Sequence, residues 1–169
     1  FPLDMFTKLN QKQKHDKVNE VLARVNLTGA NDKFPAEISG GMKKRVGIAR
    51  AIVLNPKFLF CDEPNSGLDP KTSLVIDKLI KEITIEYGMT TVVNTHDMNS
   101  VMEIGDKIIF MHQGRKEWEG TNKDIIFSKN EELNQFIFAS DFLQDAKDMR
   151  MLEAKGKISD DRDMDKLLK

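Results

Sequence analysis

The sequence predicts an α/β fold in which parallel strands alternate with helices, and three neighbouring segments indicate it. Residues 58–61 form a short, fully apolar run bounded by proline-containing pairs, as expected of a buried strand in a parallel sheet. Residues 72–87 have the character of a helix, and residues 89–94 form a second strand-like run. Because parallel strands need a crossover between them, strand, helix and strand in this order predict one layered unit.

The other elements follow from local signals. Residues 10–26 predict an amphipathic helix, with apolar residues on one face: Val18, Val21, Leu22 and Val25. Glycine, asparagine, aspartate and proline predict a loop over residues 27–36. After the second strand, Asp97 can cap a short helix to residue 104. A hairpin is predicted around residues 112–115, with strands at 106–111 and 116–119 and then helices at 122–127 and 131–143.

The segment that starts at Ile38 predicts a helix whose N-terminus suits a phosphate group. Ser39 can cap this helix, and Gly40 and Gly41 allow the backbone to come close to a ligand. The free N–H groups and positive dipole end of a helix favour an anion. Three cations follow in the first turns, Lys43, Lys44 and Arg45, and four apolar residues predict a buried face, Met42, Val46, Ala49 and Val53. Alone, this pattern also fits a glycine turn before an ordinary amphipathic helix.

Polar residues follow each predicted strand, where open α/β sheets bind their ligands. Asp62 and Glu63 end the first strand, and His96 comes just after the second. Adjacent strand residues point to opposite sides, so the two carboxylates need not share one role. Asp69 can cap the next helix, which has Pro70 in its first turn.

These motifs, in this order and spacing, resemble those of the ATP-binding-cassette (ABC) family of transporter ATPases. The resemblance is carried by S-G-G-M at residues 39–42, by C-D-E-P-N-S-G-L-D at residues 61–69 and by T-H-D at residues 95–97. It implies that Asp62 holds Mg²⁺ directly or through water, that Glu63 is the general base, and that His96 senses the γ-phosphate of ATP. It further implies that the signature residues bind ATP held by the other subunit of a dimer: Ser39, Gly40, Gly41 and Met42. Asp69 would belong to the loop that crosses the dimer interface.

The implied fold is a partial P-loop NTPase (RecA-like) parallel sheet with part of the ABC helical subdomain. No G-x-x-x-x-G-K-[ST] phosphate loop occurs in the sequence, which opens at Phe1 instead of a methionine. We therefore expect a chain truncated at its N-terminus, without the phosphate loop and Q-loop and inactive alone. The expected division is part of the helical subdomain over residues 1–55, the remaining catalytic core over 56–128, and a helical extension with a charged tail over 129–169.

The expected function is that of an ABC transporter ATPase subunit, which pairs with a second copy and with membrane permease subunits on the inner face of a bacterial membrane. Ile38 and Met42 in the signature segment resemble the Mla-type subfamily, which moves lipids. Two alternatives stay open: a non-transport ABC ATPase of the translation or DNA-repair type, and a non-catalytic partner that keeps half of a shared site. Glu63 and His96 argue against the second, because a structural half-site needs neither a base nor a switch.

Composition limits the classes of partner. The 169 residues carry a net charge of −1, which gives no strong global attraction to nucleic acid, and no nucleic-acid partner is expected. Charged residues make up 31% of the chain, and no apolar stretch is long enough for a membrane span. Cys61 is the single cysteine and is expected to be a core residue in a reducing compartment. From Asp145 onward, charged residues predict a solvated helix or a disordered tail.

Overall fold

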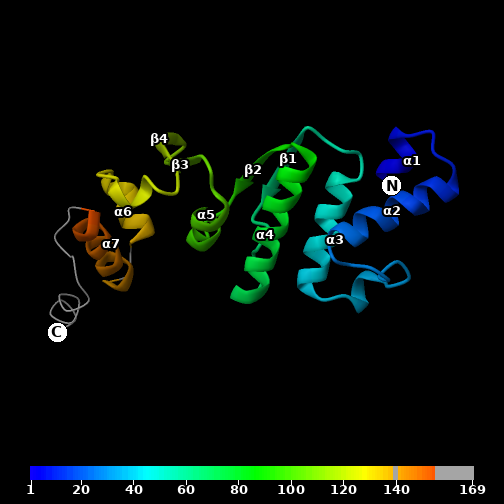
Figure 1. Ribbon diagram of the computed structural model, residues 1–169, viewed down its shortest axis with the longest axis horizontal. Helices are drawn as coiled ribbons and strands as arrows, with labels where there is room; N and C mark the ends of the chain where they lie inside the picture. The colour runs from blue at the N-terminus through cyan, green and yellow to red at the C-terminus, as the bar shows by residue number, and fades with distance from the viewer. Residues whose placement is uncertain (139–140, 155–169) are drawn as a thin grey trace. The chain divides into compact units, whose positions relative to one another are not determined.

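The computed structural model describes residues 1–138 and 141–154, and helices and strands alternate over residues 40–112 (Figure 1). The chain divides into two compact units, Phe1–Ser100 and Val101–Lys169. The predicted α/β class is confirmed. The predicted divisions after residues 55 and 128 do not coincide with this boundary and stay a prediction.

The first unit contains the elements that carry the signature, acidic and histidine motifs. In chain order these are α1 (Pro2–Phe6), α2 (Gln11–Arg24), the 3₁₀ helix η1 (Pro35–Glu37), α3 (Gly40–Ile52), β1 (Phe58–Asp62), α4 (Pro70–Tyr87), β2 (Thr90–Asn94) and the start of α5 (Met98–Ile104). The predicted order of strand, helix and strand is confirmed. Gly88 ends α4 in the left-handed conformation with φ 58°, as glycines at helix ends commonly do.

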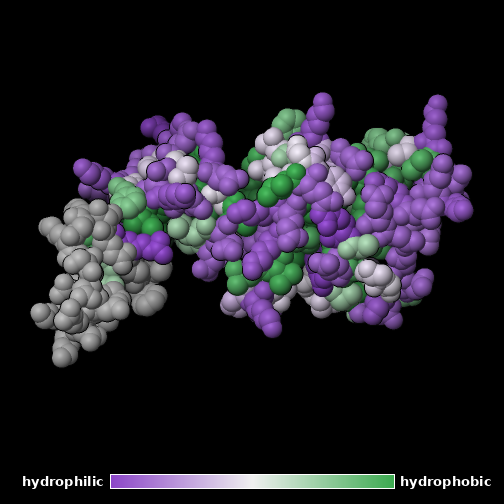
Figure 2. All heavy atoms as spheres, in the orientation of Figure 1, coloured by the Kyte–Doolittle hydropathy of each residue, from purple (hydrophilic) through white to green (hydrophobic). Residues whose placement is uncertain are grey.

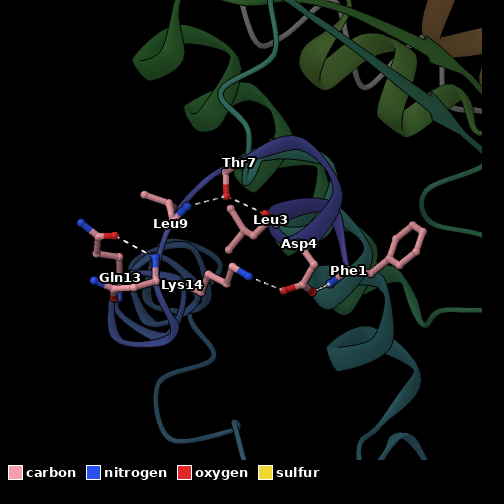
Figure 3. Close-up of polar contacts among 8 residues, drawn as sticks. Phe1, Leu3, Asp4, Thr7, Leu9, Gln13 and Lys14 are labelled. Atoms are coloured by element: carbon pink, nitrogen blue, oxygen red, sulfur yellow. Dashed lines mark hydrogen bonds and ion pairs between the residues drawn. The ribbon is translucent and has the colours of Figure 1, made fainter.

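Polar contacts at the start of the chain tie α1 to α2 (Figure 3). Asn10 caps α2 by accepting a hydrogen bond from the backbone N–H of Gln13, while the Gln13 side chain accepts one from the N–H of Asn10. This reciprocal pair satisfies two N–H groups that a helix start otherwise leaves open. Lys14 then reaches Asp4 of α1 at 2.7 Å, so the first two helices are joined by an exposed ion pair.

Helices α2, α3 and α4 pack in sequence, α2 on α3 and α3 on α4. The apolar side chains of α3 and α4 supply much of the buried core of this unit: Ile48, Ile52, Ile76, Ile80 and Ile83. The predicted buried face of α3 is therefore partly wrong. Ala49 and Val53 are buried, but Met42 and Val46 are only half-buried, and Ile48 and Ile52 take the central positions because α3 is covered on two sides.

The sheet of the first unit consists of β1 and β2 in parallel, with Phe58 opposite Thr90 and Asp62 opposite Asn94. The prediction that β1 is fully buried is wrong: Leu59 is buried, whereas Phe58 and Phe60 are 60% and 74% exposed. Alternate strand residues face opposite sides, and the described residues cover only one side of this sheet. Cys61 is half-buried rather than fully buried, and its partial burial raises the pKa of the thiol.

The second unit begins within α5 and continues with an antiparallel hairpin. Its elements are β3 (Ile108–His112), β4 (Arg115–Gly120), the 3₁₀ helix η2 (Ile125–Phe127), α6 (Glu131–Ile137) and α7 (Asp141–Ala154). Gln113 and Gly114 both have positive φ, which matches the twist of a two-residue hairpin turn, so the predicted hairpin is confirmed. The helix predicted over 131–143 is divided between α6 and α7, with residues 139–140 outside the described part.

The charged C-terminal segment is described in part. Helix α7 extends through the charged segment to Ala154, and the tail predicted beyond residue 154 lies outside the described residues. On the face that Figure 2 shows, hydrophilic residues cover much of the described surface, with smaller hydrophobic areas between them. Among the described helices, none has both the length and the hydropathy that crossing a membrane requires.

Candidate nucleotide-hydrolysing site

The carboxyl ends of β1 and β2 bring Asp62 and Asn94 together. The two residues are opposite each other in the parallel register, and the Asn94 side-chain amide donates to Asp62 Oδ1 at 2.7 Å. Asp62 is exposed, so its carboxylate is open to solvent although one oxygen is already hydrogen-bonded. Asn94 was not predicted as a site residue, and its place at the end of the second strand, two residues before His96, is the signal that could have found it.

Glu63 and His96 form a pair one step beyond the strand ends. Glu63 Oε1 lies 2.7 Å from Nδ1 of the His96 imidazole and also accepts the backbone N–H of His96 at 3.1 Å. The Glu63 backbone N–H donates to Asn94 O at 2.9 Å, which continues the sheet hydrogen bonding by one residue. Glu63 has φ 45°, an unusual conformation for a residue other than glycine and one that occurs preferentially at functional sites.

This geometry fixes the electrostatics of the pair. The hydrogen bond and charge of Glu63 raise the pKa of His96, with a smaller contribution from Asp97. The His96 side chain is 76% exposed and that of Glu63 is 33% exposed, so solvent screens their attraction. The imidazolium is the form that the Glu63 carboxylate favours.

A raised histidine pKa sets the pH dependence of this contact. We expect the His96 imidazole to titrate above its ordinary midpoint of about 6.5. The stabilising contact is complete below the ordinary pKa and is lost as the pH rises through the raised one. An NMR titration of the imidazole measures this midpoint in the chain and in its Glu63→Gln variant. The variant should titrate at lower pH, because its side chain carries no charge; an unchanged midpoint would show that Glu63 does not control His96.

The start of α3 is the position where the sequence predicted phosphate binding. Ser39 is the N-cap residue, and its hydroxyl accepts the backbone N–H of Met42 at 3.2 Å, which confirms the predicted cap. Ser39 and Gly40 are exposed and Gly41 is buried. The first N–H groups of a helix have no acceptor within the helix, so this exposed turn can receive an anion.

The segment that contains Asp69 lies against this turn in the same chain. A Cβ atom at Gly40 would be 3.5 Å from Leu68 Cδ2, and one at Gly41 would be 2.7 Å from Thr72 Cγ2. Asp69 caps α4 by accepting from the N–H of Thr72 at 3.0 Å, and its hydrogen bonds to Thr72 lower the pKa of its carboxyl. The capping prediction for Asp69 is confirmed, while its role at an interface stays a prediction.

The cations of the signature helix have more specific contacts than the sequence indicated. Lys44 donates to the backbone carbonyl of Glu63 at 3.0 Å, which links α3 to the Glu63–His96 pair. Arg45 donates to the carbonyls of Val25 and Asn26, at 3.4 and 2.9 Å, and so completes the C-terminal end of α2. Spacing could not reveal these acceptors, since they lie 19 or 20 residues away in the chain.

The side chains present fit a magnesium site that nucleotide phosphates complete better than one formed by protein ligands alone. Among the described residues, no group of three or more His, Cys, Asp or Glu side chains could hold a metal ion. Mg²⁺ is commonly bound by one or two carboxylates together with phosphate oxygens and water. The exposed carboxylate of Asp62 is one such donor, and nucleotide phosphates would have to supply others.

Comparisons with known proteins show which family the chain resembles. A family model described as ABC transporter matches residues 2–66. The chain carries sequence of an ABC transporter ATP-binding domain. The methionine import ATP-binding protein MetN of Campylobacter jejuni is 39% identical over 145 residues, which are 85% of this chain and 43% of that protein. The probable ribonucleotide transport ATP-binding protein mkl of Mycobacterium tuberculosis is 38% identical over 81% of this chain and 38% of its own length.

Solved structures of the family show the same fold. CbiO1 from Clostridium perfringens, part of the ABC transporter complex cbiONQ, gives a TM-score of 0.68 at 34% identity, over 78% of this chain and 53% of that one. The ATP-binding cassette MJ0796, a dimer bound to ADP and Pi in a post-hydrolysis state, gives 0.64 at 33% identity over 72% and 53%. The chain spans about two fifths of the length of the curated relatives it matches.

Proposed function

We propose that this chain forms the signature and hydrolytic half of an ABC transporter ATPase subunit. Glu63 orients and deprotonates the attacking water, Asp62 holds Mg²⁺, and His96 contacts the γ-phosphate. The single observation that supports this best is the 2.7 Å contact between Glu63 and His96 at the carboxyl ends of two parallel strands. When bound, Mg²⁺ neutralises charge on the phosphate oxygens.

Each residue can contribute a separate step. The Glu63 carboxylate can accept a proton from water, while the histidine beside it can donate a hydrogen bond to a phosphate oxygen. Lys44 fixes the backbone of Glu63 from α3, so the base is supported from the signature helix as well as from the sheet. The exposed turn at Ser39 and Gly40 is available to a nucleotide approaching from outside this chain.

The cargo is a separate question. The resemblance of Ile38 and Met42 to the Mla-type subfamily suggests lipid, whereas the relatives above are named for methionine import and ribonucleotide transport. We propose a transport ATPase that works as a two-fold dimer beneath membrane permease subunits, on the cytoplasmic face of a bacterial membrane.

A reconstitution experiment tests the transport function. The segment is supplied behind a phosphate loop, as a chimera with the Campylobacter jejuni relative, and MgATP hydrolysis is measured with and without permease subunits in liposomes. Stimulation by the permease subunits supports a transporter. Hydrolysis stimulated by ribosomes or DNA instead would favour a non-transport ATPase, and no hydrolysis with an intact phosphate loop would favour a half-site partner.

The 169-residue chain alone is expected to show no turnover of MgATP. Its sequence contains no lysine-bearing loop to hold the β- and γ-phosphates, and that cradle is required to position the reacting group. Phosphate release and equilibrium binding of a fluorescent ATP analogue measure this directly. The chimera with the relative's phosphate loop is the positive control, and turnover by the chain comparable to that of the chimera would contradict the prediction.

A further inference from the structure

Three polar side chains are buried in contact with one another in the first unit. Asn65, Asp77 and Ser100 are 6%, 1% and 1% exposed, in a unit whose other buried side chains are mostly aliphatic. They come from three segments: the turn after β1, the middle of α4 and the helix α5 that follows His96. Buried polar groups are costly unless they are hydrogen-bonded, so their partners need to be identified.

Their hydrogen bonds form a closed triangle. The Asn65 side-chain amide donates to Asp77 Oδ1 at 2.7 Å and to Ser100 Oγ at 2.9 Å, and Ser100 Oγ donates to Asp77 Oδ2 at 2.9 Å. The Asp77 carboxylate therefore accepts from both of the other residues. One atom is left out: Asn65 Oδ1 is buried without a hydrogen-bond partner among the described residues.

A contribution to folding stability does not explain this hydrogen-bonded triangle well. A buried polar cluster with an unmet acceptor is generally no more stabilising than well-packed apolar side chains of similar volume. Apolar residues at these positions would also suit the aliphatic face of α4, where Ile76 and Ile80 flank Asp77. A role in fixing geometry accounts better for three polar residues at these sites.

The positions of the three residues indicate which geometry they fix. Asn65 lies two residues after Glu63, in a turn closed by the Ser66 N–H donating to Glu63 O at 3.2 Å. Ser100 lies four residues after His96, in the first turn of α5. Asp77 belongs to the long helix α4 and joins both segments to one rigid element. The triangle thus connects the loop of the base with the loop of the histidine.

We propose that Asn65, Asp77 and Ser100 are positioning residues that hold Glu63 and His96 in contact. The role in hydrolysis rests on the proposed function, whereas the mechanical link is a property of this chain alone.

A matched pair of variants tests the link. Asn65→Thr and Asn65→Val have nearly the same shape and differ in one hydroxyl. We measure amide hydrogen exchange at His96, whose N–H donates to Glu63 Oε1, by NMR in the 169-residue chain without nucleotide. The valine variant should exchange at His96 roughly fivefold faster than the threonine variant, the population change expected for losing an ordinary hydrogen bond.

A control separates this effect from a general loss of stability. Thr84 on α4 and Thr91 on β2 share a hydrogen bond of 2.6 Å, so Thr84→Val removes a polar contact from the same helix outside the triangle. Exchange at His96 should be unaffected in this control. If Asn65→Val does not fold, Ser100→Ala is used instead. Its amide exchange at His96 should be faster than that of the original chain.

The outcomes distinguish the link from the proposed function. Equal exchange at His96 in the threonine and valine variants, or in Ser100→Ala and the original chain where that pair is used, overturns the positioning role. Because no nucleotide takes part, this result would leave the ATPase proposal standing. Conversely, a chimera with a complete phosphate loop that hydrolyses no ATP would defeat the ATPase proposal and leave the exchange result intact.

Discussion

Glu63→Gln is expected to slow MgATP hydrolysis about 10²–10⁴-fold in a protein that carries this segment behind a phosphate loop, the usual contribution of a general base. The amide keeps the size and hydrogen-bonding reach of the carboxylate but accepts a proton from water far less readily. ATP binding and dimer closure should change little, since the binding groups are elsewhere. Single-turnover hydrolysis and equilibrium ATP binding, measured on the same preparation, separate the two effects.

The contact with His96 gives this experiment a second arm. Glu63 has two functions in the structure, as a carboxylate facing the histidine and as a backbone group held by Lys44. Glutamine removes only the first. His96→Ala should also impair turnover by removing a γ-phosphate contact, while the carboxylate itself remains. A loss in the glutamine variant that exceeds the loss in His96→Ala identifies proton acceptance by Glu63 as the larger effect.

A matched control guards against a nonspecific effect of lost charge. Glu82 is an exposed carboxylate on α4 of the same unit, and Glu82→Gln makes the same chemical change away from the strand ends. Its hydrolysis rate should equal that of the original protein. A rate unchanged in Glu63→Gln would show that the base has been assigned to the wrong residue.

The parts of the fold that depend on neighbouring residues could be predicted from the sequence. Caps, glycine stops and strand ends are local signals, so the starts of α3 and α4 and the end of α4 were predicted within about two residues, the usual uncertainty of helix boundaries. The placement of Glu63 and His96 just after the two strands followed from the rule that open α/β sheets bind ligands at their strand ends, but the contact between them was not predicted. The φ of 45° at Glu63 was not predicted either, because no local pattern requires it.

The features that were missed depend on what covers each element. The apolar character of Phe58 and Phe60 does not distinguish a strand covered on both faces from a strand covered on a single face. Asp77 stands out only when its place on the buried side of α4 is known, and its partner Ser100 is 23 residues away. The acceptors of Lys44 and Arg45 are likewise set by packing between helices, which spacing along the chain does not encode.

The signature glycines give the second large expected effect. Gly41 is buried against Thr72, and a Cβ atom would come within 2.7 Å of Thr72 Cγ2. Thr72 cannot turn away easily, because its backbone N–H and hydroxyl are both bonded to Asp69. A side chain at position 41 therefore disturbs the capped start of α4 as well as the exposed helix turn where a phosphate would approach.

Three substitutions at this position separate fit from charge. Gly41→Ala tests fit alone, and adding Thr72→Ser should restore part of the loss, since serine lacks Cγ2 and keeps the hydroxyl that bonds Asp69. Gly41→Asn and Gly41→Asp have the same shape and differ in one charge. If phosphate binds at this turn, the aspartate variant should be much the weaker of the two, because its carboxylate repels the anion.

In a dimer of one original and one Gly41→Asp subunit, we expect only the site holding the original subunit's ATP to be disabled, by about 10²–10³-fold, as when an oriented donor to a developing charge is removed. A two-fold dimer presents the same surface twice, so each signature turn serves the nucleotide held by its partner. The mutant subunit should still bind ATP at its own phosphate loop. Cross-linking from position 41 to a photoreactive ATP analogue, with each subunit carrying a distinct tag, identifies the chain that holds the nucleotide. Label transferred between chains supports the shared site, whereas label confined to a single chain rules it out.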